Sequence, residues 1–186
     1  MKRYVVIAGV NGAGKTTLYS TEEIFSDIEK VNLDEIVRSV GNWKNVSDVK
    51  KAATIAINRI EQFFEKGVSF SQETTLCGKS ILKNINKAKE LGYFVELWYV
   101  GLDNSQIAKE RVNYRISKGG HGVPKEDIER RYYESLKNFK EVLPLCDMVI
   151  VYDNTKKLTR ISSFRNGTCD WCARELPQWY KSSTIG

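Results

Sequence analysis

The feature that most constrains the fold is the stretch GVNGAGKTT at residues 9–17. The preceding residues 4–8 are apolar and rich in β-branched side chains, which predicts a short buried strand. The pattern after Thr17 is helical. Glycines at positions 9, 12 and 14 allow positive φ angles, so that backbone N–H groups can converge on an anion. A strand, a G-x-x-x-x-G-K-T loop and a helix in this order predict a phosphate loop that binds ATP or GTP.

Each residue type in this loop has a chemical reason to be there. The ammonium group of Lys15 can bind the β- and γ-phosphates, and the hydroxyl of Thr16 can ligate Mg²⁺. The N-terminus of the following helix also favours negative charge. No motif distinguishes adenine from guanine, so the choice between ATP and GTP stays open. The predicted nucleotide-binding residues are Asn11, Gly12, Ala13, Gly14, Lys15, Thr16 and Thr17, with Thr16 as the metal ligand.

The rest of the chain alternates between strand-like and helix-like patterns. This alternation predicts an α/β protein, with the three-layer fold of P-loop NTPases, a mainly parallel sheet and a helical lid. We find no repeat and no linker, so residues 1–186 are expected to form a single domain. The helix at 46–66 is expected from the spacing of Ala53, Ala56, Ile57, Ile60, Phe63 and Phe64. Further strands are expected at 28–34, 68–74, 93–100 and 147–153, further helices at 79–92, 105–118 and 125–140, and an edge strand or hairpin at 159–167.

Composition narrows the class of partners. The chain has 186 residues, 41% of them hydrophobic, and no window approaches the length of about 18 apolar residues that a membrane helix needs. The first strand leaves no room for a signal peptide, so we expect a cytoplasmic protein without membrane contacts. The net charge of +6 fits phosphorylated small molecules as well as nucleic acid. Because the basic residues are spread along the chain, we do not expect nucleic acid as a partner.

The chain has four cysteines, which are expected to be reduced in a cytoplasmic protein. Cys169 and Cys172 form a single C-x-x-C, with no second pair and no nearby histidine to complete a zinc site. A thioredoxin-like context is also missing. We interpret this motif as a reduced turn near the C-terminus, and its role stays open.

Acidic residues follow the second and third predicted strands. In parallel sheets, ligands bind outside the carboxyl ends of the strands. Asp34 ends the second strand, Glu73 and Thr74 end the third, and Lys15 follows the first, so these residues are expected to border one crevice. A carboxylate there can accept a proton from a substrate hydroxyl or hold the metal. The alternative for Asp34 is a helix N-cap, because NLDEIV is typical of a helix start.

Residues 111–131 are typical of a lid. Arg111 and Arg115 are four residues apart and share one helix face. A glycine-rich loop containing His121, the only histidine, separates them from a second helix that carries Arg131. Such a lid excludes water and brings arginine to the phosphoryl group in transfer. The alternative is a solvated helical hairpin. The sequence therefore predicts Asp34, Arg111, Arg115 and Arg131 as catalytic residues, and Glu73, Thr74 and His121 as substrate-binding residues.

Four segments together resemble the zeta-toxin-like group of P-loop kinases: VNLDEI, ETTLCGKS, RVNYRISKGGHGVPKEDIERRYYESLKNF and VYDN. The resemblance runs from the phosphate loop to about Asn154. It implies phosphorylation of the 3′-hydroxyl of UDP-N-acetylglucosamine, a nucleotide sugar, and a small helical antitoxin as partner. By the same resemblance, Asp34 looks like the catalytic base, Glu73 like a substrate-binding carboxylate and Arg111 like the first of two phosphate-binding lid arginines.

The chain departs from that family pattern at one position. His121 stands where the toxins place their second lid arginine, so that Arg130 and Arg131 would have to replace its charge. A neutral histidine is a weaker clamp for a transition state than arginine. The acceptor, and whether the protein is toxic, therefore stay open.

Members of this group are often labelled ABC-type ATPases, which the sequence contradicts. It has no LSGGQ-type signature, and the strand ending at Asp153 is followed by Asn154 instead of glutamate. The sequence is also compatible with a polynucleotide or nucleoside kinase, and with a nucleotide-gated binding module that hydrolyses ATP slowly. Asp34 disfavours the module, since a switch needs no base on the acceptor side. We expect an ATP-dependent kinase that phosphorylates a hydroxyl of a small molecule.

Overall fold

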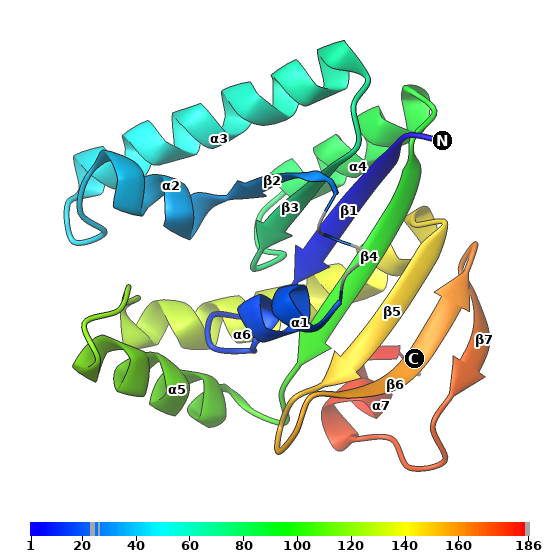
Figure 1. The fold of residues 1–186 in the computed structure, drawn as a ribbon. Coiled ribbons are helices and arrows are strands. Elements are labelled where there is room, and N and C mark those ends of the chain that lie inside the picture. The colour runs from blue at the N-terminus through cyan, green and yellow to red at the C-terminus, as the bar shows by residue number, and fades with distance from the viewer. Residues whose placement is uncertain (23–24, 26, 185–186) are drawn as a thin grey trace.

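The computed structural model describes residues 1–22, 25 and 27–184, and its centre is a seven-stranded sheet with the order β2-β3-β1-β4-β5-β6-β7 (Figure 1). The first five strands along the chain pair in parallel, and the last two pair antiparallel at one edge. The strands are β1 (Arg3–Ala8), β2 (Glu29–Asn32), β3 (Phe70–Thr74), β4 (Phe94–Gly101), β5 (Met148–Asp153), β6 (Thr159–Arg165) and β7 (Thr168–Cys172).

Helices cover both faces of this sheet, as the α/β prediction required (Figure 1). They are α1 (Lys15–Thr21), α2 (Leu33–Val40), α3 (Val46–Lys66), α4 (Ser80–Glu90), α5 (Ser105–Ser117), α6 (Lys125–Val142) and α7 (Gln178–Thr184), with a short 3₁₀ helix at Leu143–Leu145. Within the described residues, no helix combines the length and the hydropathy that crossing a membrane requires.

The central strand β1 shows why the two faces are both apolar. Successive side chains of a strand point to opposite faces of its sheet. Tyr4 and Val6 pack with helices α2, α3 and α4, whereas Val5 and Ile7 pack with α1 and α5. The continuous apolar run of β1 is thus buried on both sides, as in other parallel sheets. Helix α6 contributes residues to both clusters, so it packs with both layers.

Three details of the predicted elements were wrong. Strand β2 ends at Asn32, and Asp34 lies in the first turn of α2. Helix α3 has the predicted bounds, but Ile57 is 59% exposed while Ala52 is buried, because the buried stripe follows Ala52, Ile60 and Phe64. Cys169 and Cys172 lie on the exposed edge strand β7 instead of a turn, and both are free thiols.

The C-terminal helix α7 is anchored by one close contact that the sequence did not suggest. A Cβ atom on Gly101 would lie 2.1 Å from Cη2 of Trp179, so the indole ring occupies the space beside this glycine. The indole Nε1 also donates a hydrogen bond to Oδ1 of Asp153 at 2.8 Å. The absence of a side chain at position 101 therefore lets α7 close over the ends of β4 and β5.

This contact gives a first prediction. Gly101→Ala should lower the free energy of unfolding by about 1–3 kcal/mol, because the new methyl group overpacks against the ring. In a Trp179→Ala background the same change should cost much less, since the ring that it meets is gone. Urea unfolding of the two single variants and the double variant measures this coupling. An equal cost in both backgrounds would contradict the proposed packing.

Candidate active site

The phosphate loop connects β1 to α1 at the middle of the sheet (Figure 1). Its three glycines have the positive φ angles predicted for them, with 144° at Gly9, 82° at Gly12 and 102° at Gly14. Lys15 begins α1 and is 7% exposed, and its Nζ donates to the carbonyl of Gly9 at 2.8 Å. Thr16 and Thr17 are exposed in the first turn of α1. The loop thus presents a lysine and two hydroxyl groups at a helix N-terminus.

The two predicted carboxylates lie on the next strands outward. Asn32 at the end of β2 is opposite Glu73 in β3. Glu73 Oε1 lies 3.8 Å from Lys15 Nζ, and its Oε2 accepts a hydrogen bond from Asn32 Nδ2 at 2.7 Å. Burial lowers the pKa of Lys15, while the negative charges of Glu73 and Asp34 oppose this shift. The structure therefore brings Lys15, Glu73 and Asp34 together at the carboxyl ends of the strands.

Asn32 is a site residue that the sequence reasoning missed. Its Oδ1 accepts a hydrogen bond from the backbone N–H of Glu35 at 3.2 Å, so Asn32 is the N-cap of α2. The N-cap alternative for Asp34 is thus wrong, and the carboxylate of Asp34 is not used to cap the helix. An Asn followed three residues later by Glu matches the spacing of a capping box, and this was the available signal.

One lid arginine contacts the phosphate loop, and a second acts on the charge of Lys15. Arg131 in α6 donates from Nη1 to Oδ1 of Asn11 at 3.1 Å. Arg115 in α5 has its Nε and Nη2 buried, and neither has a hydrogen-bond partner among the described residues. The charge of Arg115 lowers the pKa of Lys15, after the larger effect of burial. Buried guanidinium groups without partners are costly, and an anion is what satisfies them.

Arg111 lies in the same helix as Arg115 but has different contacts. Its Nη2 donates to the backbone carbonyls of Asn154 at 2.8 Å and Thr155 at 3.2 Å, and its Nη1 donates to Gly12 O at 3.5 Å. Asn154 in turn donates from Nδ2 to the carbonyl of Ala13 at 2.8 Å. These hydrogen bonds hold the phosphate loop against the segment after β5. The sequence reasoning assigned no such role to Asn154, and no local pattern indicates it.

Two other predicted or candidate residues have contacts elsewhere. Arg130 is exposed and pairs with Asp127 at 2.9 Å and Glu134 at 3.1 Å on its own helix. Of the two consecutive arginines, only Arg131 therefore faces the phosphate loop. The hydroxyl of Thr74 accepts a hydrogen bond from the backbone N–H of Leu76 at 3.0 Å and so stabilises the turn after β3.

His121 in the lid loop reaches the acceptor side. Its Nε2 lies 3.3 Å from Oδ1 of Asp34, and its ring packs on Trp43 with centroids 5.4 Å apart. Burial lowers the pKa of His121 and is the largest cause; Arg115 lowers it further and Asp34 raises it. The imidazole is therefore neutral near pH 7. It lies beside the predicted base Asp34.

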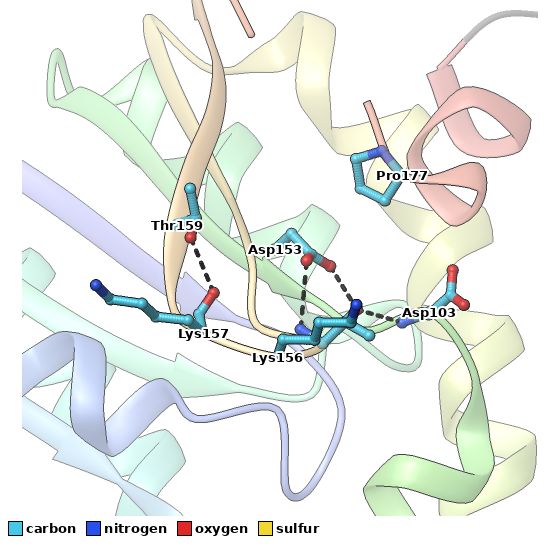
Figure 2. A pocket seen from close by; sticks show the side chains of 7 residues that line it. Asp103, Asp153, Lys156, Lys157, Thr159 and Pro177 are labelled. Atoms are coloured by element: carbon cyan, nitrogen blue, oxygen red, sulfur yellow. Dashed lines mark hydrogen bonds between the residues drawn. The ribbon is translucent and has the colours of Figure 1, made fainter. Parts of the chain in front are cut away.

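A separate pocket of about 250 Å³ lies beside β5 and α7 (Figure 2). Oδ1 of Asp153, which Figure 2 labels, accepts a hydrogen bond from the hydroxyl of Thr155 at 2.7 Å and another from Trp179 Nε1 at 2.8 Å. Because these bonds occupy the carboxylate, Asp153 has a structural role at the end of the strand. This agrees with the rejection of an ABC-type ATPase site.

The residues around Lys15 suit Mg²⁺. This ion is usually held by one or two protein ligands together with the phosphates of the substrate. The exposed hydroxyl of Thr16 and the carboxylates of Asp34 and Glu73 are oxygen donors of the kind it prefers. Across the part of the chain that the structure describes, no three acidic, histidine or cysteine residues form a ready-made metal site. Thr16, together with the phosphates of a bound nucleotide, is therefore the set of ligands that suits Mg²⁺.

The phosphate loop, the parallel sheet and the basic lid define a kinase-like phosphotransferase of the P-loop class. The zeta toxin family model matches residues 2–163, and the chain belongs to this family. An uncharacterized protein of Haemophilus influenzae (strain ATCC 51907 / DSM 11121 / KW20 / Rd) is 31% identical over 130 residues, covering 69% of this chain and 91% of the relative.

Solved structures share the fold at low sequence identity. A chain of the AvrRxo1-ORF1:-ORF2 complex has a TM-score of 0.75 at 15% identity and matches 99% of this chain; the complex with ATP gives 0.73 at 16%. This chain spans 64% of that chain, so less than two thirds of its length. The PezAT toxin–antitoxin system of Streptococcus pneumoniae gives a TM-score of 0.61 at 16% identity, covering 100% of this chain and 79% of that one.

The contact between Asn154 and the phosphate loop gives a second prediction. Asn154→Ala removes the hydrogen bond to Ala13, whose net value is about 1 kcal/mol, so ATP should bind about 5-fold more weakly. Asn113→Ala, on the exposed side of α5, is the control and should leave the affinity unchanged. Isothermal titration calorimetry with ATP and Mg²⁺ measures both. Unchanged affinity in Asn154→Ala would show that the loop keeps its shape without this contact.

Proposed function

We propose that the protein is a Mg²⁺-dependent kinase that transfers the γ-phosphoryl group of ATP to a hydroxyl of a small acceptor. The observation that carries this proposal is the meeting of cations and carboxylates around Lys15. Its Nζ lies 3.8 Å from Glu73, the charges of Asp34 and Arg115 also act on it, and Arg131 contacts the phosphate loop. The cations suit a phosphoryl group in transfer, and the carboxylates suit a hydroxyl that must lose its proton.

Each group then has a role in the transfer. The phosphate loop and Lys15 hold the β- and γ-phosphates, and Thr16 holds Mg²⁺, which neutralises phosphate charge when it is bound. Asp34 accepts the proton of the acceptor hydroxyl. At the same time the hydroxyl oxygen bonds to the γ-phosphorus, and the bond between the γ-phosphorus and ADP breaks. Arg115 and Arg131 stabilise the charge on the phosphoryl oxygens. Phosphoryl transfer depends mainly on such positioning and electrostatic stabilisation.

The first candidate acceptor is the nucleotide sugar UDP-N-acetylglucosamine. Its support is membership in the zeta toxin family together with the position of Glu73, whose carboxylate is held by Asn32, the N-cap of the helix that carries Asp34. A second carboxylate next to the base can accept a hydrogen bond from another hydroxyl of a sugar.

We also propose a protein partner that restrains the activity. The AvrRxo1 neighbour is a complex of two proteins, and PezAT is a toxin–antitoxin system. Growth arrest on expression, absent in a Lys15→Ala variant and relieved by a neighbouring gene product, would support this. Growth unaffected by the active wild-type protein would argue against a toxin.

The assignment of the base gives a third prediction. Asp34→Asn should lower phosphate transfer by about 10²–10⁴-fold, since a general base contributes that much, and should leave ATP binding intact. Lys15→Ala should remove both binding and transfer. Glu35→Gln, on the same helix and paired with Lys30, is the matched control and should transfer normally.

The assay is transfer from γ-labelled ATP with Mg²⁺ to UDP-N-acetylglucosamine, to other nucleotide sugars and to a 5′-hydroxyl oligonucleotide in parallel. Wild-type rates in Asp34→Asn would rule out Asp34 as the base. Label on the oligonucleotide alone would instead identify a polynucleotide kinase, with a salt-dependent affinity.

Two neighbouring arginines give a fourth prediction. Arg131→Ala should lower the rate of transfer by about 10²-fold or more, because it removes a cation at the phosphate loop. Arg130→Ala removes a cation one residue away that pairs with Asp127 and Glu134, and should leave the rate nearly unchanged. Single-turnover kinetics with saturating ATP distinguish the two. Equal losses would mean that only the net charge of the lid matters.

A further inference from the structure

The lid loop between α5 and α6 is packed closely onto the acceptor side of the site. A Cβ atom on Gly122 would lie 2.6 Å from Cη2 of Trp43, which is in the segment between α2 and α3. A Cβ atom on Gly120 would lie 2.6 Å from Cγ of Arg115. These two glycines therefore let the loop approach closely enough for His121, between them, to reach Asp34.

The imidazole of His121 has contacts on both sides. Its side chain is 11% exposed, with Nε2 facing Asp34 Oδ1 and one ring face near Trp43. Its Nδ1 is buried and has no hydrogen-bond partner among the described residues. A buried polar atom of this kind is costly unless a partner satisfies it.

The surroundings of His121 determine which nitrogen carries the proton. Four charged groups act on it: Asp34 raises its pKa, whereas Arg115, Arg38 and Arg131 lower it, and burial lowers it most. A neutral imidazole has one N–H and one lone pair. The carboxylate of Asp34 accepts but cannot donate when ionised, so the proton belongs on Nε2. The buried Nδ1 is then an acceptor that only a donor can satisfy.

We propose that His121 positions the catalytic base by donating from Nε2 to Asp34, and that its Nδ1 accepts a hydrogen bond from the acceptor substrate. The proposal rests on the proposed function, in which Asp34 is the base. His121 is thus not a substitute for a phosphate-binding arginine. It selects acceptors that carry a second donor, a hydroxyl or an amide N–H, next to the reacting hydroxyl. His121 itself neither gains nor loses a proton during transfer.

The first test needs no acceptor, because His121 is the only histidine of the chain. In untagged ¹⁵N-labelled protein, the imidazole signals belong to this residue alone. We expect a neutral ring with the proton on Nε2 at pH 7.5 and a pKa below the usual value near 6.5. The pKa should fall further in Asp34→Asn, since the opposite charge is lost. A protonated ring, or a proton on Nδ1, would overturn the proposal even if the protein is a kinase.

The second test measures transfer from γ-labelled ATP to UDP-N-acetylglucosamine. His121→Ala should lower kcat by about 10- to 100-fold, the value of a hydrogen bond to a charged group. His121→Gln, whose amide N–H can take the place of Nε2–H, should restore most of the rate.

The shorter His121→Asn, whose amide reaches only the position of Nδ1, should not restore the rate. Equal rates in all three variants would overturn the positioning role while leaving the kinase intact. If wild-type protein transfers no label to this nucleotide sugar, the proposed acceptor fails, and the imidazole spectrum still decides the protonation and contact of His121.

Discussion

The structure depends on the packing of the phosphate loop against the strand and segment beside it. At Gly9 a Cβ atom would lie 2.3 Å from the carbonyl oxygen of Val100, so the loop leaves β1 in direct contact with β4. At Gly14 the corresponding distance to Asn154 Nδ2 is 2.2 Å. Glycine is therefore required at Gly9 for close approach to the backbone of β4, and the positive φ angles favour it at both positions. These contacts fix the backbone of the loop, and they therefore fix the directions of the N–H groups that can bind an anion.

The order of the strands then places the two halves of the site. β1 is at the centre, with β3 on one side and β4 on the other. The neighbours β3 and β2 bring Glu73 and the start of α2 next to Lys15. The chain leaving β4 enters α5 and α6, which return with arginines over the same loop. Parallel strands thus bring residues that are far apart in sequence to the same edge of the sheet. No single segment of the chain contains the whole site.

This explains which parts could be predicted from the sequence. The phosphate loop, the strand before it and the meeting of Asp34 with Glu73 follow from local patterns and from the rule that parallel strands share one functional edge. Contacts between side chains and backbone carbonyls cannot be predicted from such patterns, because any polar residue at the right distance can make them. Asn154 and Arg111 belong to this group. The exposed strand β7 and the helix α7 were also missed, since β7 has no buried face and α7 depends on a gap at Gly101.

The charge balance around Asp34 accounts for histidine, and not arginine, at position 121. A guanidinium group 3.3 Å from this carboxylate, the distance found for His121, would form an ion pair with it. Arg115 and Arg131 already supply positive charge at the phosphate loop, so a third cation is not needed for binding phosphate. In the proposed mechanism, a neutral imidazole fixes the orientation of the carboxylate without forming an ion pair with it. The proposal thus separates the binding of phosphate from the activation of the hydroxyl, and assigns the first to the helices of the lid and the second to its loop.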